Sequence, residues 1–195
     1  MSLRLTTGFC SGMSLQSANE GTRPTSGKVR AAVLNSIQMR LTGAKMLDAF
    51  AGSGAIGIEA LSRGAEQVTF VESGKEALVA LRVNLKEVDR RAQKLSLRPV
   101  IRIESVSVAK ALPLQKDGSF DLLWFDPPYA LLANEWPVWA KEIDRIATAE
   151  ALVIVESDEA GAEFLKTWSE DSAWELQKQK SYGIIHVSYF ERKGQ

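Results

Sequence analysis

Apolar residues alternate along most of the chain between short compact runs and positions three or four apart. From residue 45 onward, the compact runs are typical of buried strands and the spaced positions of amphipathic helices. The predicted strands cover residues 46–50, 67–72, 98–103, 120–125 and 151–155. The predicted helices cover residues 55–63, 75–90, 106–112, 136–147 and 160–168. Such alternation favours a parallel sheet with helices on both faces.

Two further strand-like runs end the chain without a helix between them. Residues 174–182 and 184–190 are separated by Gly183 alone. Strands joined so closely must be antiparallel, because a parallel connection needs a crossover of a dozen or more residues. We therefore predict the α/β arrangement of the Rossmann-like methyltransferase fold, a mostly parallel seven-stranded sheet with an antiparallel C-terminal hairpin.

The N-terminal part of the chain has a less regular pattern. Its first 19 residues contain short mixed runs separated by Gly8 and Gly12, which favours an irregular segment or a small hairpin. A helix is expected to begin near Thr25, since the preceding proline suits a helix entry. We divide the chain into a hairpin-like extension over residues 1–20 and a methyltransferase domain over residues 21–195.

Composition narrows the classes of protein that remain. The chain has 195 residues, 45% of them hydrophobic, which suits one globular domain with an appendage. No apolar run approaches the roughly 20 residues that span a bilayer, and residues 1–15 resemble no signal or transit peptide. The chain has a single cysteine, Cys10, which excludes an intrachain disulfide. It also has only one histidine, and so few ligands argue against a zinc site. We expect a cytoplasmic monomer without a metal, and Cys10 as a structural thiol.

Charge is unevenly distributed although the formal net charge is zero. Residues 1–45 hold six basic residues and one acidic residue, a net charge of +5, so the remainder carries −5. A basic N-terminal segment on an acidic body indicates contact with a polyanion. An ordinary solvated helix face would give the same count.

A glycine-rich turn follows the first strand of the alternating region. Residues 48–57 read Asp-Ala-Phe-Ala-Gly-Ser-Gly-Ala-Ile-Gly, in which Gly52 and Gly54 allow a sharp turn and a close approach to a ligand. Glu72 ends the next strand, where a carboxylate can accept both hydroxyls of a ribose. The predicted cofactor-binding residues are Asp48, Phe50, Gly52, Ser53, Gly54, Glu72 and Ser73.

The cofactor itself is ambiguous from the glycines alone. Residues 52–57 also match the G-x-G-x-x-G fingerprint of NAD(P)-binding domains. Asp48 favours S-adenosylmethionine, because an acid before the glycines would repel a pyrophosphate but could bind an ammonium group, directly or through water. A tight turn without any ligand is a further alternative.

The fourth predicted strand breaks into Asp126-Pro127-Pro128-Tyr129. The two prolines fix the backbone and remove two donors, so the turn presents the Asp126 carboxylate and the Pro127 carbonyl as acceptors. An exocyclic NH₂ group of a nucleic-acid base needs such acceptors to orient it toward an electrophile. Tyr129 can stack on the plane of the base, and Trp136 is a second aromatic candidate. We therefore predict Asp126, Pro127, Pro128 and Tyr129 as the catalytic residues, although Asp-Pro-Pro also occurs in ordinary loops.

With these motifs in place, the sequence resembles the bacterial 16S ribosomal RNA guanine-N2 methyltransferases of the RsmD type. The likeness covers nearly the whole chain. The segments that resemble the family are Thr22-Arg23-Pro24-Thr25 and the helix after it, residues 47–64, Phe70-Val71-Glu72, Asp126 to Tyr129, and Tyr182-Gly183. The chain departs from the family's pattern at Phe9-Cys10-Ser11, at Ala31 and after the third strand, where an acid is missing.

The resemblance implies methyl transfer from S-adenosylmethionine to N2 of a guanine in ribosomal RNA or the small ribosomal subunit. Arg23, Thr25 and Arg30 are the implied substrate-binding residues. Four alternatives stay open from the residues: a DNA adenine-N6 methyltransferase, a protein-glutamine methyltransferase, an NAD(P)-dependent oxidoreductase, and a non-catalytic RNA-binding relative.

Overall fold

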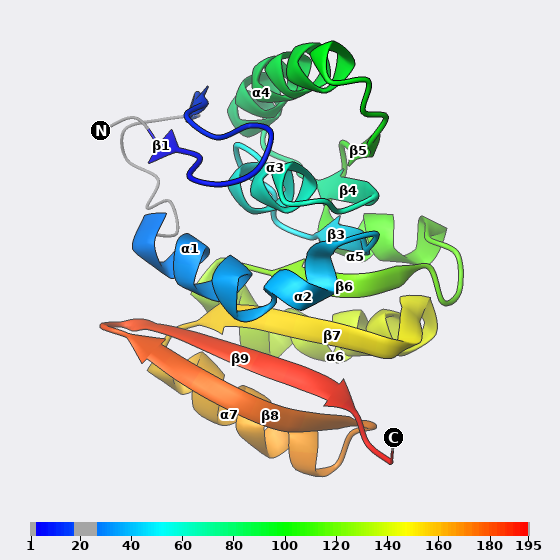
Figure 1. Cartoon of the computed structure of the whole chain (residues 1–195). Helices are drawn as coiled ribbons and strands as arrows, with labels where there is room; N and C mark the ends of the chain where they lie inside the picture. The colour runs from blue at the N-terminus through cyan, green and yellow to red at the C-terminus, as the bar shows by residue number, and fades with distance from the viewer. Residues whose placement is uncertain (1–2, 18–26, 195) are drawn as a thin grey trace. The chain divides into compact units, whose positions relative to one another are not determined.

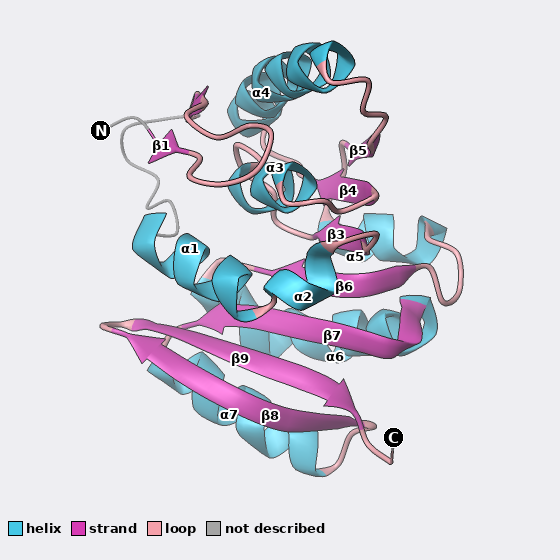
Figure 2. Cartoon of the chain, viewed as in Figure 1, coloured by secondary structure: helices cyan, strands magenta, loops and turns pink. Residues whose placement is uncertain are grey.

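The computed structural model describes residues 3–17 and 27–194 (Figure 1). The chain forms two compact units, Met1–Ser107 and Val108–Gln195. Each unit contains strands flanked by helices, as the colouring by secondary structure shows (Figure 2).

The first unit begins with a small antiparallel hairpin of β1 (Leu3–Arg4) and β2 (Ser14–Leu15), as the sequence predicted. Three parallel strands then pair in the order β5 (Val100–Glu104), β4 (Gln67–Val71) and β3 (Lys45–Asp48). The remaining elements of this unit are α1 (Gly27–Ser36), α2 (Gln38–Leu41), α3 (Ala55–Ser62) and α4 (Lys75–Lys94).

Burial explains why these segments form their elements. Every residue of β4 is buried, including the polar Gln67 and Thr69, as expected for a strand with both faces covered. Helix α3 packs closely on β4, because a Cβ atom at Gly57 would collide with the Phe70 ring. Helix α4 buries Leu81, Leu85 and Val88, which share one helix face. The first unit therefore has a core between its strands and these helices.

The second unit contains the C-terminal strands in the order β6 (Phe120–Phe125), β7 (Ala147–Ser157), β9 (Ile185–Arg192) and β8 (Trp174–Tyr182). β6 and β7 are parallel, whereas β9 is antiparallel to both β7 and β8. Helices α6 (Tyr129–Ile146) and α7 (Glu159–Glu170) both lie behind β7, β9 and β8 in the view of Figure 1. The remaining elements are α5 (Val108–Ala111) and the 3₁₀ helix η1 (Leu112–Leu114).

The predicted fold class is confirmed. In the described residues, the alternating strands and helices give a mostly parallel seven-stranded sheet with an antiparallel C-terminal pair. The C-terminal hairpin turns at Gly183, which adopts a positive φ of 68° that glycine accepts without strain. The predicted domain boundary at residue 20 lies outside the described residues.

Helix α6 differs most from its prediction. The sequence predicted a helix over residues 136–147, but α6 spans Tyr129–Ile146 and begins directly after Pro128. Pro128 occupies the N-cap, with a ψ of 122°. Pro137 lies inside the helix, where it cannot donate a backbone hydrogen bond. Burial of Leu132, Trp136, Trp139 and Ile143 on one face stabilises the helix despite that lost bond.

Candidate active site

The glycine-rich turn of the first unit connects β3 to α3. Gly52 and Gly54 have φ values of 54° and 84°, a region that side chains with a Cβ rarely adopt. Among the described residues, nothing apart from the chain neighbours of Gly52 lies within 4 Å of where its Cβ would be, so the space around it is open. The backbone of this turn can therefore approach a ligand closely at Gly52.

Glu72, directly after β4, closes one side of the glycine turn. Its Oε2 accepts from the Gly52 N–H at 2.8 Å, and its Oε1 accepts from the Gly74 N–H at 2.6 Å. Each carboxylate oxygen has a further lone pair, so Glu72 can still accept hydroxyl groups of a ribose. The structure thus brings together Glu72 and Gly52, which the sequence had assigned to one site.

Asp48 lies deeper than a ligand-facing residue would. Its side chain is only 1% exposed, and its Oδ2 accepts from the Gly57 N–H of α3 at 3.0 Å. This bond joins the end of β3 to the first turn of α3, where backbone donors lack helical partners. Asp48 therefore sets the geometry of the turn.

The other predicted cofactor residues flank this turn. Phe50 and Ser53 are half-buried, whereas Ser73 is exposed. The Ser53 carbonyl accepts from the side-chain amide of Asn84 at 2.9 Å. Sequence reasoning overlooked Asn84, although a polar residue between Leu81 and Leu85 on the buried face of α4 is a usable signal.

The Asp-Pro-Pro-Tyr segment lies in the second unit, between β6 and α6. Asp126 and Tyr129 are half-buried, Pro127 is buried and Pro128 is exposed. The Pro128 carbonyl accepts from the Leu131 N–H at 2.8 Å, which starts the first turn of the helix. Asp126 therefore stands at the carboxyl end of a parallel strand, the edge at which ligands bind in open α/β sheets.

Aromatic side chains pack beneath this segment. Phe125 contacts Trp136 with ring centroids 5.7 Å apart and Trp139 at 6.1 Å. Trp136 in turn lies 5.1 Å from Trp168. Trp136 is fully buried, so the expectation that it could touch a substrate is wrong and it belongs to the core. Tyr129 is the more accessible of the two aromatic candidates.

Glu156 and His186 accompany the neighbouring strands of the second unit. Glu156 is 3% exposed near the end of β7. His186, in β9, pairs in register with Ser157, and its Nδ1 lies 3.1 Å from Ser181 Oγ. The strand pairing and the contact with Ser181 give His186 a structural role in the sheet.

The implied substrate-binding residues have different outcomes. Arg23 and Thr25 lie outside the described residues. Arg30 is only 1% exposed, and its Nε donates to Glu59 Oε2 at 2.7 Å. Its charge is therefore neutralised inside the first unit, so Arg30 is not presented to a polyanion.

Glu59 is the centre of a buried ionic cluster. Besides Arg30, it accepts from Arg63 Nη2 at 2.6 Å and from Thr6 Oγ1 at 3.0 Å. Burial alone would raise the pKa of Glu59, but the hydrogen bonds from Arg63 and Arg30 outweigh it and hold the pKa below its ordinary value. Arg30 Nη2 also donates to the Arg4 carbonyl at 2.8 Å, so the cluster attaches the N-terminal hairpin to α1 and α3.

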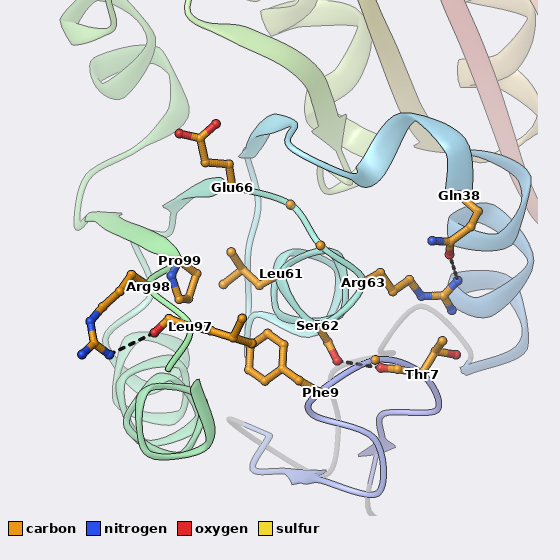
Figure 3. A pocket seen from close by; sticks show the side chains of 13 residues that line it. Thr7, Phe9, Gln38, Leu61, Ser62, Arg63, Glu66, Leu97, Arg98 and Pro99 are labelled. Carbon is orange, nitrogen blue, oxygen red and sulfur yellow. Dashed lines mark hydrogen bonds between the residues drawn. The ribbon is translucent and has the colours of Figure 1, made fainter. Parts of the chain in front are cut away.

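A separate cavity of about 610 Å³ lies near the amino ends of β4 and β5 in the first unit (Figure 3). Its walls include Leu61 and the residues that precede β4 and β5, namely Gly64 to Glu66 and Leu97 to Pro99. In Figure 3, Ser62 lies beside Thr7, and its Oγ donates to the Thr7 carbonyl at 2.6 Å. The glycine turn follows the carboxyl end of β3, so this cavity is not part of the candidate site.

Cys10 behaves as a structural residue. It is fully buried, and burial raises the pKa of its thiol to about 11.

Among the described residues, no group of three or more His, Cys, Asp or Glu side chains could hold a metal ion. No described helix is long and apolar enough to cross a membrane.

Comparison with known proteins places these features in a family. The family described as "Conserved hypothetical protein 95" matches residues 3–191. Ribosomal RNA small subunit methyltransferase D of Haemophilus influenzae is 30% identical over 190 residues, covering 97% of this chain and 93% of that protein. The protein of the same name in Escherichia coli K12 is 30% identical over 176 residues, covering 90% and 82%.

Solved structures agree with the fold. The Escherichia coli protein yhhF has a TM-score of 0.74 and 26% identity, with full coverage of both chains. Precorrin-6y C5,15-methyltransferase of Geobacter metallireducens has a TM-score of 0.68 and 17% identity, covering 92% of this chain and 94% of that one. The predicted Rossmann-like methyltransferase fold is therefore confirmed.

Proposed function

Because the chain belongs to the Conserved hypothetical protein 95, or RsmD-type, family, we propose that it methylates the exocyclic N2 of a guanine in 16S ribosomal RNA. The family makes the chain a ribosomal RNA methyltransferase, and the proposal adds the atom and the donor. The donor is S-adenosylmethionine. The observation that carries the proposal is Asp126-Pro127-Pro128-Tyr129 at the carboxyl end of β6, in a chain whose first unit holds the glycine turn and Glu72.

The residues of the first unit fit S-adenosylmethionine. Glu72 offers a carboxylate for the ribose hydroxyls, and the open space at Gly52 admits a close backbone approach. Asp48 and Glu72 give the turn negative charge, which suits a cation and disfavours the pyrophosphate of NAD(P). Phe50, Ser53, Gly54 and Ser73 complete the proposed cofactor-binding set.

The second unit supplies the groups that act on the target amine. When bound, S-adenosylmethionine provides an electrophilic methyl group. The guanine N2 lone pair is delocalised into the ring, so the amine needs orientation and stabilisation of the positive charge it gains. Asp126 and the Pro127 carbonyl accept its two N–H groups, and Tyr129 stacks on the base. Nitrogen gains the methyl group and then loses one proton to water or to Asp126.

Replacement of Asp126 tests this assignment. We expect Asp126→Ala to bind S-adenosylhomocysteine like the wild type but to lose at least about 100-fold in kcat, since a group that stabilises developing charge is removed. The assay is labelled-methyl transfer to small ribosomal subunits, with naked ribosomal RNA, duplex DNA and a glutamine peptide in parallel.

The exposed Asp171→Ala is the matched control and should leave kcat unchanged. Full turnover by Asp126→Ala would reject the catalytic assignment. Methylation of duplex DNA or peptide in preference to RNA would reject the proposed substrate, and binding of NADH without S-adenosylhomocysteine would reject the proposed cofactor.

Arg23 and Thr25 remain proposed contacts to the RNA. The buried Arg30 supports the N-terminal hairpin through Glu59 instead of touching the substrate. One of the six basic residues in 1–45, Arg30, is therefore paired with Glu59 inside the first unit.

A further inference from the structure

Asn84 connects two parts of the first unit that are far apart in sequence. It lies on α4 and is only 2% exposed. Its Nδ2 donates to the carbonyls of Ser53 and Gln16, both at 2.9 Å, and its Oδ1 accepts from the Gln16 N–H at 2.9 Å. Both donors of one amide are therefore committed, one to the glycine turn and one to the N-terminal segment.

The two ends of this bridge both concern the proposed function. Ser53 stands between Gly52 and Gly54, whose positive φ angles leave the turn dependent on outside contacts for its shape. Glu72 restrains the turn through the Gly52 N–H, and Asn84 restrains it through the Ser53 carbonyl. At the other end, Gln16 directly follows β2 and precedes Arg23 by seven positions in the sequence.

Burial makes the bridge costly to break. An amide removed from water must keep its hydrogen bonds, and an unpaired buried carbonyl costs about 1–3 kcal/mol. Displacement of Gln16 would leave Asn84 short of two bonds, and a shift of Ser53 would leave it short of one. The two segments therefore change position together more readily than separately.

We propose that Asn84 is a positioning residue that couples the N-terminal segment to the cofactor-binding turn. This rests on the proposed function, in which the turn binds S-adenosylmethionine and the N-terminal segment meets RNA. Contact of RNA with the segment that contains Gln16 favours the binding-competent turn. By reciprocity, the bound cofactor favours the RNA-binding arrangement of that segment.

Two substitutions cut the bridge from opposite ends. Asn84→Asp keeps the size of the side chain and one acceptor but removes both amide donors. Gln16→Pro removes the N–H that Asn84 accepts, at an exposed position, and Gln16→Ala keeps that N–H as its control. Ser62→Ala loosens the same hairpin at Thr7 and Cys10 without touching the glycine turn.

Titration with S-adenosylhomocysteine, with and without saturating small ribosomal subunits, measures the coupling. In the wild type, subunits should tighten binding at least about fivefold, the low end of typical coupling. We expect that ratio to fall to about one in Asn84→Asp and in Gln16→Pro, and to persist in Gln16→Ala and Ser62→Ala. Without subunits, Asn84→Asp should raise the Kd about tenfold, and adding Gln16→Pro should raise it little further.

Amide hydrogen exchange at residues 52–54 provides a readout that needs no ligand. Both bridge-cutting variants should accelerate exchange there, whereas Ser62→Ala should not. An undiminished coupling ratio with unchanged exchange in Gln16→Pro would overturn the proposal, even if Asn84→Asp fails to fold. A wild-type ratio of one would overturn the coupling as well. Failure of the wild type to bind S-adenosylhomocysteine would reject the proposed cofactor, and exchange would still decide the role of Asn84.

Discussion

The two candidate loops are supported in opposite ways. The glycine turn has little rigidity of its own and is held by polar groups around it, namely Asp48, Glu72 and Asn84. The Asp-Pro-Pro-Tyr segment is stiffened by its own prolines and rests on packed aromatic rings. Polar support depends on charge and hydrogen-bond geometry, whereas aromatic support depends on volume. The first loop should therefore respond to single polar substitutions, and the second to loss of bulk.

The buried ionic cluster around Glu59 is separate from the contacts of the glycine turn, and among the polar contacts of the first unit it should show the largest effect. Glu59→Ala leaves Arg30 and Arg63 buried without their shared carboxylate, so we expect a loss of about 5 kcal/mol in the free energy of unfolding. Chemical denaturation at pH 7 measures this loss. A change below about 1 kcal/mol would show that the cluster contributes little.

The same cluster makes the stability of the first unit depend on pH. The pKa of Glu59 is lower in the folded protein than in the unfolded chain, so its stabilisation is complete above about pH 4.3, the unfolded value. It declines as the pH falls through the lower folded pKa. Glu59→Ala should therefore flatten the dependence of stability on pH below about 4.

The aromatic cluster should show a similar but pH-independent effect. Trp136→Ala removes a fully buried indole that contacts Phe125 and Trp168, and we expect a loss of about 3–4 kcal/mol. The loss should be equal at pH 7 and pH 4. If it grew in acid, the contrast between the two kinds of support would be wrong.

Glu72 should affect ligand affinity more than folding. Glu72→Ala frees the N–H groups of Gly52 and Gly74 and removes the proposed ribose acceptor. Hydrogen bonds to charged groups contribute about 1.5–3 kcal/mol, so the Kd for S-adenosylhomocysteine should rise about 10- to 100-fold. Tyr129→Ala is the matched control and should leave that Kd unchanged.

The smallest effect is expected from loss of one proline. Pro128→Ala keeps the N-cap position of α6 exposed and unobstructed but adds backbone freedom worth about 0.4–1 kcal/mol. The value of kcat/KM should fall about two- to fivefold with the Kd for S-adenosylhomocysteine unchanged. A loss as large as that of Asp126→Ala would mean that Pro128 does more than stiffen the turn.

Sequence periodicity was sufficient for the fold because each strand and helix carries its own apolar pattern. The strands around Gly52, Glu72 and Asp126 and the C-terminal hairpin all follow from such local patterns. The start of α6 did not, since Pro137 inside a helix contradicts local propensity and is tolerated only through burial of the surrounding face.

The candidate site was predictable where a motif carries the chemistry and not where long-range contacts do. Glu72 and Gly52 meet as expected. Arg30 was predicted to bind the substrate, and its pairing with Glu59 was not predicted, because Glu59 lies 29 residues away and no local sequence pattern indicates that contact. The bridge made by Asn84 joins segments 68 and 31 residues from it, a distance that only the folded chain reveals.

We propose that this chain places one methyl group on N2 of a guanine in 16S ribosomal RNA. The most direct test is mass spectrometry of that RNA from cells with the protein, without it, and with Asp126→Ala. We predict that one N2-methylguanine is present with the wild type and absent in the other two. An unchanged set of methylated nucleotides in cells that lack the protein would contradict the claim.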